Sequence, residues 1–235
     1  MPPFLLSCLE VLVGIALLFG GGELFVQGAV TLSLIFGIPQ LVIGLTVVSF
    51  GTSAPELFVS LSSVTQGFDA LAVSNVVGSN IFNVMVVLGS SALVMPLRVE
   101  SRLVRRDVPL LIAVSAAVWG MASAGRVTWQ AGLALLLALA INSVWEIRTA
   151  REEPEGVEEA EPEVNPDQGK RGVARAIGLL VVGIVLLGVG SRVLVHGASA
   201  AATFLGVSQA VIGLTIVSAG TSMPELITSL VAAVK

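Results

Sequence analysis

A motif of fourteen residues occurs twice in this chain. Residues 44–57 read GLTVVSFGTSAPEL, and residues 213–226 read GLTIVSAGTSMPEL. Each copy places a glutamate, Glu56 or Glu225, inside an apolar segment and directly after a proline. An ionisable side chain at the centre of a membrane span costs at least about 2.5–3.5 kcal/mol, so it marks a functional site by default. The repetition therefore predicts two halves of one polar site.

The similarity between the two copies extends beyond the motif. With an offset of 169 residues, residues 37–61 align with residues 206–230 without a gap, and 17 of these 25 positions are identical. Chance similarity between apolar helices would not place Gln, Thr, Ser, Pro and Glu at matched positions. We therefore infer an internal duplication.

Composition indicates the class of protein. The chain has 235 residues, of which 55% are hydrophobic and 12% are charged, whereas about 25% of residues are charged in soluble domains. Several apolar runs exceed the roughly 20 residues that cross a hydrocarbon core. No basic patch suggests a nucleic-acid partner. The sequence predicts an all-α polytopic membrane protein whose main environment is the lipid bilayer.

Seven spans are expected in the chain. They cover approximately residues 4–36, 40–64, 70–94, 108–124, 128–144, 173–205 and 208–235. The sixth span is the copy of the first, and because the copies are five spans apart, the second copy should cross the membrane in the opposite direction. Inverted repeats with Gly/Pro-interrupted polar helices are typical of secondary transporters.

The domain organisation follows from the repeat. We expect a first five-span repeat over residues 1–149, an acidic linker over 150–172, and the start of a second repeat over 173–235. Residues 146–172 are acidic, contain proline and have almost no large apolar side chains, so they are expected to form a disordered tether. The loops after the third and fifth spans are rich in arginine and lysine, whereas the opposite side carries only Arg126. The positive-inside rule therefore places the linker in the cytoplasm and the N-terminus outside.

The residues around each glutamate suggest a cation site. Pro55 and Pro224 have no N–H, so each should leave a main-chain carbonyl without its helical partner, and Gly51 and Gly220 should ease local unwinding. Unpaired carbonyls at membrane depth are tolerated where they line a cavity. Hydroxyl groups share a helix face with each glutamate; they belong to Thr52, Ser53, Thr221 and Ser222.

The third span adds Ser79 and Asn83, which lie four residues apart on one face. All of these donors are hard oxygen atoms, and no Cys or His joins them. This chemistry favours Ca²⁺ or Na⁺ over zinc or copper. Two facing carboxylates would repel each other unless cations or protons neutralised them, and this penalty on an empty site favours exchange over leak.

The motifs GTSAPELFVSL and GSNIFN, followed by a second GTSMPEL, resemble the cation/calcium exchanger superfamily, and prokaryotic sodium/calcium exchanger-like members most closely. The resemblance implies ten spans in two inverted halves, Ca²⁺/Na⁺ antiport as the activity, and a location in the cell's plasma (inner) membrane. It implies Glu56 and Glu225 as ion-binding carboxylates. Further ligands implied by position are Thr52, Ser53, Thr221, Ser222, Ser79 and Asn83, with Ser49 and Ser218 at positions that contribute a main-chain carbonyl.

Several alternatives remain open. Exchange could instead be coupled to H⁺ or K⁺. The counterpart of SNVVGSNIFN is expected near position 243, so the chain is interpreted as truncated within the second repeat. As a fragment it could be non-transporting or need a second chain.

The candidate site residues could also have other roles. The glutamates could be a structural pair, and the hydroxyls could bond to their own helices. An intramembrane hydrolase using Ser53 or Ser222 would need a general base at the same depth, such as His or Lys. We predict no catalytic residue and no cofactor, with Ca²⁺ and Na⁺ as transported substrates.

Overall fold

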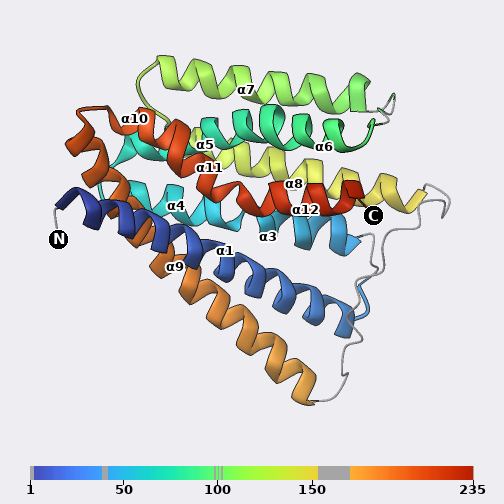
Figure 1. Cartoon of the computed structure of the whole chain (residues 1–235). Helices are drawn as coiled ribbons and strands as arrows, with labels where there is room; N and C mark the ends of the chain where they lie inside the picture. Colours follow the sequence, from blue (N-terminus) through green and yellow to red (C-terminus); the bar gives the residue numbers. More distant parts are fainter. Residues whose placement is uncertain are drawn as a thin grey trace. The chain divides into compact units, whose positions relative to one another are not determined.

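The computed structural model describes residues 3–38, 42–97, 99, 101, 103–152 and 170–234. The elements formed by these residues are all helices (Figure 1), which confirms the predicted all-α class. The chain divides into two compact units, Met1–Met95 with Val157–Lys235 and, separately, Pro96–Gly156. Both copies of the duplicated motif belong to the first unit.

The first unit contains the two motif-bearing regions. Its N-terminal part consists of α1 (Pro3–Ile35), the π-helical turn η1 (Ile43–Val48), α3 (Ser49–Thr52), α4 (Ala54–Thr65), α5 (Asp69–Phe82), the π-helical turn η2 (Asn83–Val87) and α6 (Leu88–Val94). Its C-terminal part consists of α9 (Lys170–Leu205), α10 (Gln209–Ile212), the π-helical turn η4 (Gly213–Val217), α11 (Ser218–Thr221) and α12 (Met223–Val234). The second unit consists of η3 (Leu103–Asp107), α7 (Val108–Ser123) and α8 (Trp129–Glu152).

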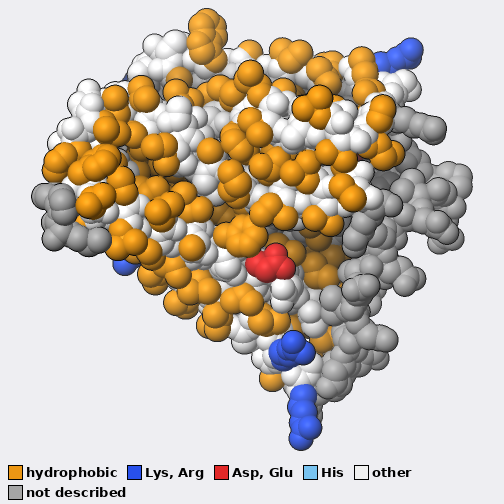
Figure 2. All heavy atoms as spheres, viewed as in Figure 1, with side chains coloured by type: hydrophobic (Ala, Val, Ile, Leu, Met, Phe, Trp, Pro, Cys, Tyr) orange, Lys and Arg blue, Asp and Glu red, His pale blue; other side chains and the backbone are white. Residues whose placement is uncertain are grey.

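Most of the described helices have the length and apolar composition of membrane spans. Four of them are long and apolar enough to cross one, and the number rises to six if each of two bent helix pairs forms one span. These six correspond to six of the seven predicted spans. The remaining helix, α7, has 16 residues and would extend about 24 Å, less than the roughly 30 Å of a hydrocarbon core. Hydrophobic side chains are spread widely over the face seen in Figure 2, where few charged side chains are visible, as expected for a surface in contact with lipid.

The helices extend further into the acidic region than predicted. α8 continues to Glu152 and α9 begins at Lys170, so both ends of the segment expected to be disordered are helical. Glu and Arg are good helix formers, and Glu146 of α8 is also bonded to Arg106, which lies 4.9 Å from the ring centre of Trp145. The tether predicted between these helices falls on residues 153–169, which lie outside the described part of the chain.

Glycines allow α1 and α9 to pack closely side by side (Figure 1). A Cβ atom on Gly14 would lie 2.7 Å from the main chain of Leu194, and one on Gly28 would lie 2.7 Å from the carbonyl oxygen of Ala176. Residues later in α1 thus meet residues earlier in α9, which makes the pair antiparallel. Because α9 is the copy of α1, this arrangement agrees with the predicted inversion.

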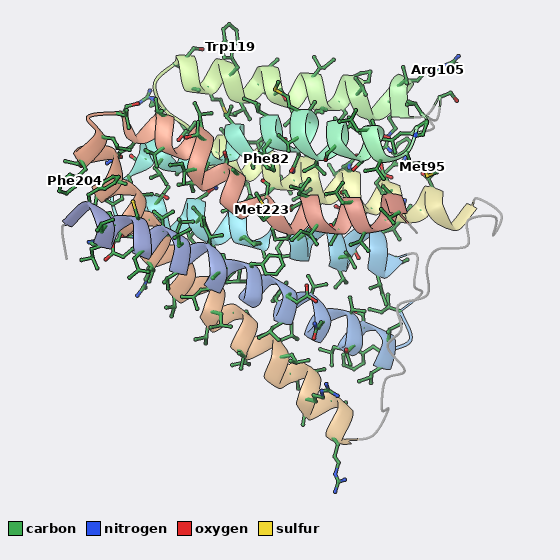
Figure 3. The ribbon with its side chains drawn as sticks, in the orientation of Figure 1. Phe82, Met95, Arg105, Trp119, Phe204 and Met223 are labelled. Atoms are coloured by element: carbon green, nitrogen blue, oxygen red, sulfur yellow. The ribbon has the colours of Figure 1, made fainter. Side chains whose placement is uncertain are left out.

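Aromatic packing closes one end of this helix pair. The rings of Phe4 and Phe204 have centroids 6.0 Å apart at a tilt of 58°, and Figure 3 marks Phe204 on α9. Tilted aromatic pairs at this separation are favourable beyond their burial from solvent. The antiparallel pair is therefore fixed by side-chain contacts at its end as well as by close backbone contact along its length.

Candidate ion-binding site

Both copies of the motif form a helix that breaks at the same serine. Ser53 leaves the helical conformation with φ −85° and ψ 3°, and Ser222 does so with φ −87° and ψ 10°. The flanking helices meet at 46° in the first copy and 45° in the second. Each break is preceded by a π-helical turn, a feature that often marks functional sites. The interruption predicted from the prolines is therefore present in both repeats.

The prolines themselves are accommodated by the helices that follow. Pro55 is the second residue of α4, and Pro224 is the second residue of α12. At these positions a helix does not need the missing N–H, so each proline lets a new helix begin. Met223, which opens α12 immediately after the second break, is labelled in Figure 3.

The motif glycines allow close approach of α1, a role beyond the local unwinding expected from the sequence. A Cβ atom on Gly51 would collide with the side chain of Val26, and one on Gly220 would lie 2.7 Å from Ile15 Cδ1. Both contacts are with α1, and both glycines lie within short helices before the breaks. The glycines thus permit α1 to approach both broken helices, and the breaks fall two residues later.

The two repeats exchange hydrogen bonds at the breaks. Ser222 Oγ donates to Glu56 Oε1 over 3.0 Å, and Ser53 Oγ donates to Glu225 Oε1 over 3.4 Å. The neighbouring threonine hydroxyls lie near the same carboxylates, Thr221 near that of Glu56 and Thr52 near that of Glu225. Each glutamate is therefore held by hydroxyls of the other repeat, and the two motifs form one polar cluster.

Three oxygen atoms in this cluster have no protein donor. Within the described residues, Glu56 Oε2, Glu225 Oε2 and Asn83 Oδ1 are buried and lack a hydrogen-bond partner. A buried acceptor without a partner costs roughly 1–3 kcal/mol, and more if it is charged. The two carboxylates also lie close enough to repel each other. Binding of a cation in the cluster would therefore be electrostatically favourable.

The third predicted span contributes to the same region. Ser79 is buried on α5, where its hydroxyl donates to the carbonyl of Val76 over 3.1 Å. Asn83 begins η2, directly after the labelled Phe82 in Figure 3, and α12, the helix of Glu225, packs against η2. The structure thus places both residues on a helix that contacts the second repeat.

The hydroxyls of Ser49 and Ser218 bond to their own helices. Ser49 Oγ donates to the carbonyl of Gly44 over 3.2 Å, and Ser218 Oγ donates to that of Leu214 over 2.7 Å. These bonds satisfy carbonyls of the π-helical turns. The main-chain oxygens of Ser49 and Ser218 accept hydrogen bonds from the hydroxyls of Thr52 and Thr221, at 3.3 and 3.2 Å. Each carbonyl is therefore directed toward the next turn of its own motif.

The two halves of the cluster differ in exposure. In the second repeat, Ser218, Thr221 and Ser222 are almost completely buried, because α11 and η4 pack against α5. In the first repeat, Ser49 and Ser53 are exposed among the described residues. The two copies of the motif therefore have nearly the same backbone conformation, but the second copy is buried more deeply than the first.

Sequence analysis missed one residue of the cluster. Asn75 is not among the ligands predicted from the sequence, yet it is fully buried and its side chain contacts both repeats. Its Nδ2 donates to the main-chain oxygen of Glu56 over 3.3 Å, and its Oδ1 accepts from Thr221 over 3.4 Å. The signal was present in the spacing, since Asn75, Ser79 and Asn83 recur every four residues along one helix face.

Other charged residues of this unit pair away from the motifs. Glu10 of α1 and His196 of α9 are joined by an oxygen–nitrogen contact of 2.9 Å. Glu23 accepts from Gln27 one turn further along α1, over 2.9 Å. These contacts engage Glu10, His196 and Glu23 outside the motif cluster.

The available donor atoms define the kind of site. Within the described ranges, no three His, Cys, Asp or Glu side chains gather into a metal-binding group. A cation here would be held by two carboxylates together with hydroxyl, amide and carbonyl oxygens, a ligand set that suits Ca²⁺ or Na⁺. A carboxylate-lined site between broken, inverted helices defines the class of secondary transporters.

Comparison with known proteins identifies the family. The model of the sodium/calcium exchanger protein family matches residues 6–147 and 175–235, so this chain belongs to that family. A putative antiporter, CaxA, from Alkalimonas amylolytica is 37% identical over 98% of this chain and 72% of its own length. The sodium/calcium exchanger MaX1 from Methanosarcina acetivorans is 30% identical over 96% of this chain and 74% of its own length.

A solved structure agrees with this assignment. The sodium/calcium exchanger from Methanococcus jannaschii is 33% identical, with a TM-score of 0.55, over 98% of this chain and 72% of that protein. The sequence-based prediction of a cation/calcium exchanger with an all-α transporter fold is thereby confirmed. The chain is an antiporter of the membrane.

Proposed function

We propose that this protein exchanges Ca²⁺ for Na⁺ across the membrane and binds both ions in the cluster formed by the two motifs. Glu56 and Glu225 supply the carboxylates that neutralise the ions. The other proposed ligands are hydroxyl, amide and main-chain oxygens of Thr52, Ser53, Thr221, Ser222, Ser79, Asn83, Ser49 and Ser218. The proposal draws support from the names of the relatives and from the chemistry of the cluster.

The observation that carries the proposal is the group of three buried oxygens without a donor. Glu56 Oε2, Glu225 Oε2 and Asn83 Oδ1 come from three different helices. A structural carboxylate pair would be expected to share a proton or to find donors for every oxygen, because an unpaired buried acceptor is costly. Cations bound among these helices would supply positively charged partners for these oxygens, and hard oxygens are the preferred ligands of Ca²⁺ and Na⁺.

The same charges explain why transport takes the form of exchange. One Ca²⁺ ion or several Na⁺ ions can neutralise the two carboxylates, whereas the empty site retains two like charges in a medium of low dielectric constant. Reorientation of the empty site is therefore unfavourable. Ca²⁺ that leaves must be replaced by Na⁺ before the protein can return, which couples the two fluxes.

Orientation follows from the distribution of basic residues. Arg105, Arg106 and Arg148 belong to the arginine-rich loops and helix ends that the positive-inside rule assigns to the cytoplasm. We therefore place the N-terminus outside and the acidic segment inside, in the plasma (inner) membrane of the cell. Proteolysis of right-side-out and inside-out vesicles tests this orientation, because only the inside-out vesicles should expose the acidic segment.

Transport by reconstituted protein tests the function. Vesicles that contain the protein and are loaded with Na⁺ should take up ⁴⁵Ca²⁺ when diluted into Na⁺-free buffer, and a Glu225→Gln variant should not. Vesicles loaded with K⁺, or given a proton gradient without Na⁺, provide the comparison for other coupling ions. Uptake that follows K⁺ or H⁺ and ignores Na⁺ would show that the coupling ion has been assigned wrongly.

A further inference from the structure

Asn75 lies at the point where three elements of the cluster meet. It belongs to α5, and its side chain is completely buried between α4 of the first repeat and α11 of the second. Its Nδ2 donates to the main-chain oxygen of Glu56 over 3.3 Å and to Ser60 Oγ over 3.1 Å. Its Oδ1 accepts from Thr221 Oγ1 over 3.4 Å. One amide thus connects an ion-binding glutamate with a hydroxyl of the opposite repeat.

The chemistry of its partners fixes the orientation of this amide. A main-chain carbonyl can only accept a hydrogen bond, so the nitrogen of Asn75 must face Glu56. The oxygen then faces Thr221, whose hydroxyl must donate. Both ends of the amide are engaged by protein atoms, so we expect Asn75 to act on the site through its neighbours.

Thr221 has a single proton and more than one acceptor for it. Its hydroxyl lies 3.4 Å from Asn75 Oδ1 and 3.2 Å from the carbonyl oxygen of Ser218, and it lies near the Glu56 carboxylate. A cation on that carboxylate repels a hydroxyl proton pointing toward it. With its proton directed to Asn75 or Ser218, as in this structure, the hydroxyl keeps an oxygen lone pair for a cation bound at Glu56.

We propose that Asn75 is a positioning residue of the ion site, which ties the Glu56 main chain to Thr221 and accepts the Thr221 hydrogen bond, so that the Thr221 hydroxyl presents a lone pair to a bound cation. This inference rests on the proposed function, because it assumes that the cation binds at Glu56. Packing around Asn75 supports a fixed position. A Cβ atom on Gly78 would lie 2.6 Å from Ser218 Oγ, and one on Gly213 would collide with Ser74, so α5 packs closely against the second repeat on either side of Asn75.

The test compares the same substitution at two asparagines of one helix. Asn75→Leu removes both hydrogen-bonding ends and roughly keeps the volume. Asn80→Leu is the matched control, because Asn80 is exposed and its Nδ2 bonds only to the Val76 carbonyl of its own helix. Equilibrium ⁴⁵Ca²⁺ binding to the purified protein should weaken about 10-fold in Asn75→Leu, the lower end of the range for residues that orient metal ligands, and should not change in Asn80→Leu.

A second pair of variants separates positioning from general stability. If Asn75 acts through Thr221, the losses of Ca²⁺ affinity in Asn75→Leu and Thr221→Val should not add in the double variant. Thermal unfolding of the ion-free protein shows whether each variant is folded. If the leucine substitution prevents folding, Asn75→Ala replaces Asn75→Leu. Unchanged Ca²⁺ affinity in a folded Asn75 variant, or fully additive losses, would overturn the proposal. Failure of the unmodified protein to bind Ca²⁺ would instead count against the proposed function.

Discussion

Ser222 of the second repeat donates a hydrogen bond of 3.0 Å to Glu56 of the first. The duplicated partners, Ser53 and Glu225, form the corresponding bond at 3.4 Å. Each repeat therefore supplies the carboxylate that the other repeat's serine holds. A site of this kind exists only when both repeats are in place, which gives a physical reason for the two motifs to have kept the same residues.

The two serines should contribute unequally to ion binding. Ser222 is fully buried and makes the shorter bond, whereas Ser53 is exposed and makes the longer one. A hydrogen bond to a charged group contributes about 1.5–3 kcal/mol when it is well formed, so Ser222→Ala should weaken Ca²⁺ binding by about 10-fold or more. Ser53→Ala should have a smaller effect. Titration of each variant with Ca²⁺ measures the difference, and equal losses would show that burial does not govern the contribution.

Ca²⁺ should stabilise the folded protein. A ligand present at 100 times its dissociation constant adds about 2.7 kcal/mol to stability when it binds only the native state, and here it also relieves the repulsion between Glu56 and Glu225. The melting temperature should therefore rise with Ca²⁺ concentration, and Na⁺ should have the same effect at higher concentration. Glu56→Gln should abolish the response to Ca²⁺, while Glu23→Gln on α1 serves as the control. A rise that persists in Glu56→Gln would place the stabilising ion elsewhere.

Asn83 should show opposite effects on stability and on binding. Its Oδ1 is buried without a donor, so Asn83→Leu removes an unsatisfied acceptor and should leave the ion-free protein equally or more stable. The same change removes a ligand and should weaken ion binding. Thermal unfolding without ions and Ca²⁺ titration give the two readings. A strong loss of ion-free stability would mean that Asn83 supports the fold and is no ligand.

Adjacent glycines in α1 offer a test of the helix pair. A Cβ atom on Gly21 would lie 2.9 Å from both Leu186 and Leu187 of α9, whereas one on Gly20 would meet nothing within 4 Å. Gly21→Ala should force the helices apart and destabilise the protein by about 1–3 kcal/mol. Gly20→Ala should be neutral or stabilising, because alanine is the better helix former by about 1 kcal/mol. Unfolding of the two variants in detergent compares them directly, and equal stability would contradict the close packing.

The sequence predicted the parts of this architecture that are built into its repeat. Matched Gly, Pro and Glu residues predicted both helix breaks, and the odd number of spans predicted the antiparallel α1–α9 pair. The packing role of Gly51 and Gly220 could not be predicted from the repeat, because it depends on contacts with Val26 and Ile15 of α1. The spacing of Asn75 places it on the same helix face as Ser79 and Asn83, but its contacts could not be predicted, since its partners are 19 and 146 residues away in the chain. Such contacts depend on tertiary packing, which local pattern does not encode.

The central claim is that Glu56 and Glu225 form one shared ion site. Equilibrium binding of ⁴⁵Ca²⁺ to the purified protein, with the number of ions bound per chain as the readout, tests it most directly. Glu56→Gln and Glu225→Gln should each abolish high-affinity Ca²⁺ binding completely, while Glu23→Gln should bind as the unmodified protein does. Partial binding that survives in both single variants and disappears only in the double variant would show two independent sites and contradict the account.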